Sequence, residues 1–127
     1  MKRWPTVSVG GVVAIWDIKS GWSFVDPVLQ VDCTLFSNDV FEESLVSKLP
    51  IAREWISLLK NDIKTAVNDY AMKSALPTDV QEMQGIDVSD LSAKDTIDIC
   101  YISEEWADFG INIVITNGRI DNVYGGD

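Results

Sequence analysis

The chain has 127 residues, near the usual size of one domain, and its 46% hydrophobic and 24% charged residues are typical of a globular protein. Twenty acidic residues outnumber ten basic ones, so the net charge is −10, which argues against direct nucleic-acid binding and against docking on an anionic membrane. No apolar run reaches the roughly 20 residues of a membrane span, and we expect one cytoplasmic domain over 1–127.

The first third of the chain is predicted to form three β segments. Turn residues separate them, namely Lys19-Ser20-Gly21 and then Asp26-Pro27. The predicted segments are Thr6–Asp17, Trp22–Val25 and Val28–Phe36. In the third segment apolar residues alternate with polar ones, which is the pattern of a half-buried antiparallel strand.

The middle third is predicted to be helical. Asp39 and Glu42 have the spacing of a capping box, and Pro50 suits the first turn of a longer helix. Large apolar residues then recur every three or four positions and form one stripe: Trp55, Leu59, Ile63, Ala66, Val67 and Tyr70. This spacing predicts one long helix over about 51–74.

After Leu76-Pro77 the sequence is polar as far as about Asp95, and three strands are expected beyond it. Thr96–Ser103 is the first, and Phe109–Thr116 and Arg119–Tyr124 flank Asn117-Gly118, the favoured pair for a two-residue hairpin turn. The predicted fold class is therefore α+β, with a mostly antiparallel sheet of about five to six strands packed by one long helix in the order βββ-α-βββ.

Negative charge is concentrated in residues 79–108, where nine acidic residues accompany one base, Lys94. An acidic surface accelerates encounter with a basic protein, so we expect a basic protein partner. The same charge would also keep a solvated loop soluble, and composition alone does not separate these interpretations.

Catalytic motifs are missing from the sequence. The chain contains no histidine, which excludes Ser-His-Asp and Cys-His machinery, and it has no phosphate-binding loop. Cys33 and Cys100 have no zinc-site spacing and are expected to be buried thiols, although a disulfide would form if they lay close together in an oxidising compartment. We therefore expect no enzyme activity, no metal and no cofactor.

Two chemical alternatives stay open at this point. Glu104, Glu105 and Asp108 beside Trp106 could form a carboxylate pair with an aromatic platform for a sugar. The acids at 87, 90 and 95 could bind a cation, but their spacing does not fit an EF-hand loop, and a solvated loop is the simpler interpretation. Trp106 itself is expected either to anchor an interface or to fold back with Phe109 and close the core.

Several short motifs resemble small acidic immunity proteins of polymorphic and contact-dependent growth inhibition toxin systems in bacteria. The motifs are Trp16-Asp17 followed by Trp22, the helix with Trp55 and Tyr70, Glu104-Glu105-Trp106, Asp108-Phe109-Gly110-Ile111, Asn117-Gly118 and Tyr124-Gly125-Gly126-Asp127. The resemblance implies a protein that binds and neutralises a cognate toxin domain, for example a nuclease, whose basic substrate-binding surface an acidic inhibitor can cover.

The resulting hypothesis is an immunity protein with a partner-binding surface made of Asp87, Asp90, Asp95, Glu104, Glu105, Trp106, Asp108, Asp121 and Asp127. The first alternative is a carboxylate-based enzyme or a small-ligand-binding module with its pocket between helix and sheet. The second is a structural protein that forms a homodimer through an exposed strand edge. The sequence leaves the choice between monomer and homodimer open.

Overall fold

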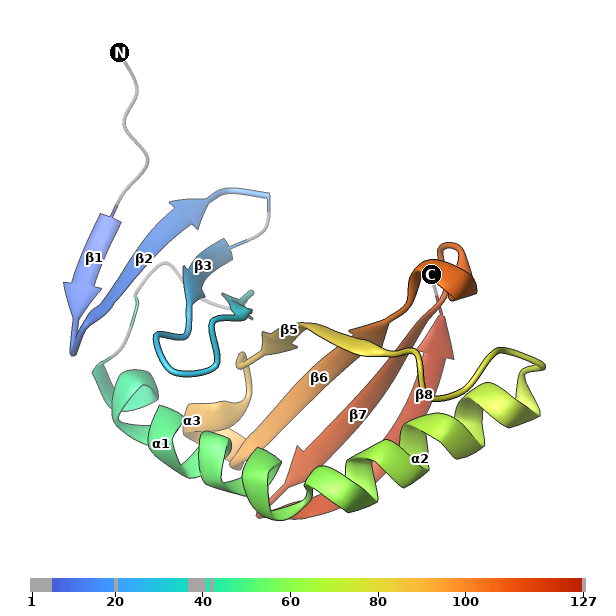
Figure 1. The fold of residues 1–127 in the computed structure, drawn as a ribbon. Coiled ribbons are helices and arrows are strands. Elements are labelled where there is room, and N and C mark those ends of the chain that lie inside the picture. Colours follow the sequence, from blue (N-terminus) through green and yellow to red (C-terminus); the bar gives the residue numbers. More distant parts are fainter. Residues whose placement is uncertain (1–5, 20, 37–40, 42, 127) are drawn as a thin grey trace.

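The computed structural model describes residues 6–19, 21–36, 41 and 43–126. Within them the chain forms one eight-stranded sheet, two longer helices on one of its faces, and two short helical turns (Figure 1). The elements are β1 (Thr6–Val9), β2 (Val12–Asp17), β3 (Gly21–Val25), β4 (Asp32–Leu35), α1 (Glu43–Leu58), α2 (Lys60–Lys73), β5 (Glu82–Asp87), α3 (Leu91–Lys94), β6 (Thr96–Ile102), the 3₁₀ turn η1 (Glu104–Trp106), β7 (Gly110–Thr116) and β8 (Arg119–Gly126).

The strands lie in the sheet in the order in which they occur in the chain, from β1 to β8. Every neighbouring pair is antiparallel except β4 and β5, which are parallel and are joined by α1 and α2. A parallel pair needs a long crossover, and the two helices supply it. Figure 1 shows them following one face of the curved sheet end to end, with α2 packed on β7 and β8. No helix in the described ranges is long and apolar enough to cross a membrane.

The expected order βββ-α-βββ with five to six strands is wrong, and two strands account for the difference. The segment Thr6–Asp17 is a hairpin of β1 and β2, because Gly10 and Gly11 both adopt positive φ and turn the chain between Val9 and Val12. The other strand is β5, which lies in the stretch expected to be an irregular polar segment. Its sequence carries few apolar residues and a bulge between Met83 and Gly85, so it lacks the usual alternation.

The expected single helix over 51–74 is also wrong. Helix α1 begins earlier, at Glu43, so Pro50 lies inside it, and the helical segment is broken at Leu59, whose φ is −95° and ψ is 8°. The Leu59 N–H still donates to the Trp55 carbonyl at 2.9 Å, and the Ile63 N–H to the Leu59 carbonyl at 2.7 Å. The break is therefore a kink that bends the helical layer around the curved sheet. The predicted capping box of Asp39 and Glu42 lies outside the described residues.

The core lies between the helices and the sheet. Its fully buried residues alternate along β6 and β7 and meet apolar positions of the helices: Ile97, Ile99, Ile111, Ile113 and Ile115 from the strands, and Leu45, Leu49, Ile63 and Val67 from the helices. The Asn117-Gly118 turn between β7 and β8 is confirmed, and both residues have positive φ. Because the helices cover one face, the polar side chains of β4–β8 are left on the other face.

Candidate functional site

The face of β4–β8 opposite the helices, called here the open face, carries rows of polar side chains that the strand register brings together. One row crosses all five strands and consists of Asp32, Gly85, Cys100, Asn112 and Tyr124. The adjacent row consists of Thr34, Asp87, Asp98, Val114 and Asn122. Directly opposed residues of a sheet point to the same side, so the side chains of each row lie next to one another, except at Gly85, which has none.

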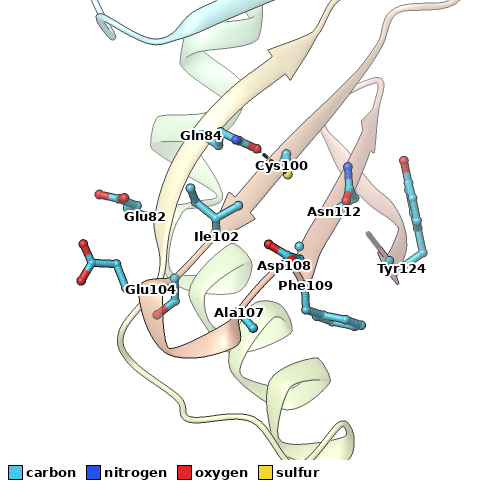
Figure 2. A pocket seen from close by; sticks show the side chains of 13 residues that line it. Glu82, Gln84, Cys100, Ile102, Glu104, Ala107, Asp108, Phe109, Asn112 and Tyr124 are labelled. Atoms are coloured by element: carbon cyan, nitrogen blue, oxygen red, sulfur yellow. Dashed lines mark hydrogen bonds between the residues drawn. The ribbon is translucent and has the colours of Figure 1, made fainter.

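Two cavities hollow this face. The larger, about 690 Å³, lies at the end next to η1, and the smaller, about 330 Å³, lies over β4 and β5. They share Gln84, Cys100 and Asn112, so they adjoin each other on this face. Figure 2 shows Glu82 and Glu104 toward one side of the larger cavity and Asn112 and Tyr124 toward the other.

Six carboxylates line the two cavities: Asp32, Glu82, Asp87, Asp98, Glu104 and Asp108. Among the described residues neither cavity is lined by lysine or arginine. Asp87 and Asp98 face each other directly across β5 and β6, an arrangement that is unfavourable for two like charges. We call this concave region, defined by the six carboxylates with Cys100, Asn112 and Tyr124, the acidic face. A hollow lined by one sign of charge concentrates its field on an incoming cation.

Asp98 is held in place at the centre of the acidic face. The Asn112 side-chain amide donates to its Oδ1 at 3.1 Å, and the Tyr124 hydroxyl donates to its Oδ2. Burial, the hydrogen bond to Asp98 and the charges of Asp98 and Asp87 raise the pKa of Tyr124 to about 12. Tyr124 therefore remains a donor at neutral pH and fixes the direction of the carboxylate.

Asp87 and Cys100 are also tied to neighbouring groups. Asp87 accepts from the backbone N–H of Ser89 at 2.9 Å, and the Ser89 hydroxyl accepts from the Phe36 N–H at 2.9 Å, which joins the ends of β5 and β4. The Cys100 thiol donates to Gln84 Oε1 at 3.4 Å. Burial and the nearby charge of Asp98 raise the pKa of Cys100 above its ordinary value, so the thiol stays protonated and is a weak nucleophile.

The structure brings only part of the predicted site together. Asp87, Glu104 and Asp108 line the acidic face. Asp90, Glu105 and Asp121 line neither cavity, and all three are exposed. Asp127 lies outside the described residues.

Asp95 has a structural contact on the opposite side of the sheet. Its Oδ1 accepts from Lys48 Nζ at 2.7 Å, and the same ammonium donates to the carbonyls of Leu91 and Ser92 at 3.3 and 2.9 Å. Lys48 belongs to α1, so this group ties α1 to α3 and satisfies carbonyls at the end of a short helix.

Of the two interpretations of Trp106, the one in which it anchors an interface does not fit this structure. Its side chain is 2% exposed, and the indole N–H donates to the Pro77 carbonyl at 2.8 Å. Phe109 packs beside Tyr70, with ring centroids 6.3 Å apart. The alternative interpretation, in which both aromatics close one end of the core, describes their positions. Because Trp106 is buried, it cannot serve as the expected aromatic platform for a sugar beside Glu104 and Asp108.

Sequence reasoning missed half of the acidic face, namely Asp32, Glu82 and Asp98, together with Asn112 and Tyr124. A signal was present for Asp98, because it alternates with the buried residues Ile97 and Ile99 and must point away from the core. The positions of Asp87 and Asp32 relative to Asp98 could not be assigned without β5. Within the described residues no group of three or more Cys, Asp or Glu is arranged to hold a metal ion.

No protein-family model, curated protein sequence or solved structure matches this chain.

Proposed function

We propose that this protein is an immunity protein that binds a basic bacterial toxin domain and blocks its activity through the acidic face. The observation that carries the proposal is the pairing of shape and charge: a concavity with six lining carboxylates and, in the described part of the chain, no lining cation. Charge of one sign in a hollow steers an oppositely charged protein toward it and speeds association.

The chemistry of the acidic face favours binding over catalysis. The chain has no histidine to transfer protons near neutral pH, and Cys100 is kept in its weakly nucleophilic thiol form. The like-charged pair Asp87 and Asp98 opposes folding, and such a pair is understandable when a partner neutralises it.

The partner is expected to insert a lysine or arginine at Asp98. The Asn112 and Tyr124 donors occupy one hydrogen-bonding direction on each Asp98 oxygen and fix the carboxylate before the partner arrives. A carboxylate can accept further bonds, and a guanidinium matches it with two parallel N–H groups. Fixing the acceptor in advance reduces the ordering cost of binding.

The proposal is tested first by co-expressing the protein with the product of the gene immediately upstream. The expected outcome is rescue of growth and co-purification of a complex. The interface is then tested with the triple variant Asp32→Lys, Glu104→Lys and Asp108→Lys. Three exposed helical acids give a matched control with the same change of net charge: Glu54→Lys, Asp62→Lys and Asp69→Lys.

The face variant should slow association at low salt by about tenfold or more and flatten its dependence on ionic strength, whereas the control should keep most of that dependence. Equal effects of the two triples would show that only net charge matters. If neither triple variant changes association, the interface lies elsewhere on the protein. If the upstream product is not toxic and forms no complex with this protein, the immunity role loses its support.

A further inference from the structure

A third cavity, of about 540 Å³, lies on the helix-covered side of the sheet and shares no residue with the acidic face. It lies where α1 passes into α2, over the first residues of β5 and the last of β6. Its lining comes from both helices, from the turn after β3 and from the segment before β5. Its volume is within the range of small-molecule sites.

The cavity follows from the topology of the sheet. Strand β4 begins at Asp32, which pairs with Gly85, so the start of β5 has no β4 neighbour. The turn that carries Leu29 takes the place of a strand there, and the kink at Leu59 bends the helical layer above it. Asp79, which lines the cavity, is held by two hydrogen bonds with Asn68 of α2, at 2.8 and 3.0 Å.

The lining combines an apolar floor with a cationic rim. The floor residues are Leu29, Ile56, Ile63, Val67, Met83 and Tyr101. The rim holds Arg53, Lys60 and Lys64 against one acid, Asp79, which reverses the charge balance of the chain as a whole. Arg53 is paired with Asp26 and Lys64 approaches Asp79 at 3.7 Å, while Lys60 has no ion pair among the described residues.

One buried polar atom lies next to the cavity. Gln81 lines the cavity, and its Oε1 is buried without a hydrogen-bond partner in the described part of the chain. Leaving such an atom unpaired is unfavourable. The atom is closed to solvent, so the features that indicate a ligand are the apolar floor and the cationic rim of the cavity.

We propose that this cavity is a second binding site, which takes a small amphiphile with an apolar chain and a carboxylate head group. The chain lies on the apolar floor, and the carboxylate lies at the rim, where Lys60 supplies the positive charge. The site belongs to the core between helices and sheet, so it does not depend on the function of the acidic face.

Isothermal titration calorimetry with two soluble amphiphiles of equal chain length tests the proposal on the unmodified protein. Decanoate carries the proposed head group, and decyltrimethylammonium carries the opposite charge. Decanoate should bind with one site per chain and at least about fivefold more tightly than the cation, as expected for one charge contact at a partly exposed rim. Equal affinities, or binding of neither, would overturn the proposal.

Three variants locate the binding. Lys60→Glu should weaken decanoate binding about fivefold or more, because it replaces attraction by repulsion at the rim. Lys73→Glu is the matched control, since it makes the same charge change on α2 outside the cavity, and it should change affinity less than about twofold. Ser57→Trp fills the exposed mouth and should reduce binding at least about tenfold. If Lys60→Glu and Lys73→Glu behave alike and Ser57→Trp still binds, decanoate occupies another place and the assignment is wrong.

Discussion

Asp26 is the one carboxylate in the described part of the chain that is buried in the core, with 2% of its surface exposed. Arg53 of α1 donates to it from Nε at 2.9 and 3.0 Å and from Nη2 at 2.6 Å, and the Val28 N–H adds a longer bond at 3.4 Å. A buried carboxylate without these donors would be strongly unfavourable. The pair therefore fixes the turn after β3 against α1, on the wall of the 540 Å³ cavity between helices and sheet.

The stability of the protein should depend on the charge of Asp26 in acid. Burial raises the pKa of Asp26, but the hydrogen bonds from Arg53 and Val28 outweigh it and hold the pKa below its ordinary value of 3.8. A lowered folded-state pKa stabilises the fold above the ordinary value, and this stabilisation is lost as pH falls toward the folded-state pKa. In urea unfolding, the advantage of the wild type over Asp26→Asn should be largest near neutral pH and shrink below about pH 4. A constant difference from pH 3 to pH 7 would contradict this.

The accessibility of each thiol shows on which face of the sheet its side chain lies. Cys33 is in the core, where burial and then the charge of Asp26 raise its pKa to about 12, whereas Cys100 is half-buried on the acidic face. A thiol reagent at pH 8 should slowly modify one cysteine in the native protein and both in urea. Cys100→Ser should abolish the native reaction. Modification of both thiols in the folded wild type, or of Cys33 in the folded Cys100→Ser variant, would show that the strand faces are assigned wrongly.

At the scale of elements, β8 is held against α2 by a close aromatic contact. The rings of Tyr70 and Phe109 stack, and Gly125 lies against both. A Cβ added at Gly125 would come within 2.5 Å of Phe109 and 2.6 Å of Tyr70, whereas a Cβ at Gly126 meets nothing within 4 Å. This contact closes the end of the core that adjoins the acidic face.

The neighbouring glycines therefore form a matched pair for mutagenesis. Gly125→Ala must displace two packed rings and should lower the free energy of unfolding by about 1–3 kcal/mol, the usual effect of overpacking a core. Gly126→Ala should change it by less than about 0.5 kcal/mol. Urea unfolding monitored by tryptophan fluorescence measures both. Similar stabilities of the two variants would mean that β8 is not seated on the aromatic pair.

The sequence predicted those elements whose signals are local. The β7–β8 hairpin was predictable because Asn117-Gly118 demands its turn, and β6 because its isoleucines alternate. The kink at Leu59 was not, since nothing in the apolar stripe interrupts the helical period. β5 was not predictable either, because its place beside β4 depends on a parallel contact between distant parts of the chain.

The same difference between local signals and contacts of distant segments applies to the candidate site. Asp87, Glu104 and Asp108 were found from the local concentration of acids, and all three line the acidic face. That criterion also selected Asp95, which pairs with Lys48 on the other side of the sheet. Asp32 was missed because it lies far from the acidic segment in the chain and joins the face only through the strand register.

At the scale of the whole molecule, the net charge of −10 is unevenly distributed in space. The acidic face holds carboxylates without lining cations, while the helices carry acids such as Asp62 between Lys60 and Lys64. Self-repulsion on a concave surface destabilises the folded state and is screened by salt. A face that is unfavourable for folding is consistent with selection for binding rather than for stability.

Neutralising the face should therefore stabilise the protein at low ionic strength. The triple variant Asp32→Asn, Glu82→Gln and Asp108→Asn should raise the free energy of unfolding by about 0.5–1 kcal/mol in 10 mM salt, and by much less in 500 mM salt. The helical control Glu54→Gln, Asp62→Asn and Asp69→Asn changes net charge equally and should not stabilise the protein. Urea unfolding at the two salt concentrations measures the difference. A salt-independent gain, or an equal gain in the control, would mean that the face is not under electrostatic strain.

The parallel pairing of β4 with β5 should form later during folding than the antiparallel pairs. Each antiparallel pair closes a short loop, but the parallel pairing brings together groups as far apart as Phe36 and Ser89, which are 53 positions apart in the sequence. Loop closure over such a distance is entropically unfavourable until the flanking hairpins and the helices are in place. In pulsed hydrogen exchange during refolding, the amides of β6–β8 should be protected before those that pair β4 with β5. The acidic face spans the pairing of β4 with β5, so it would be the last part of the molecule to be completed.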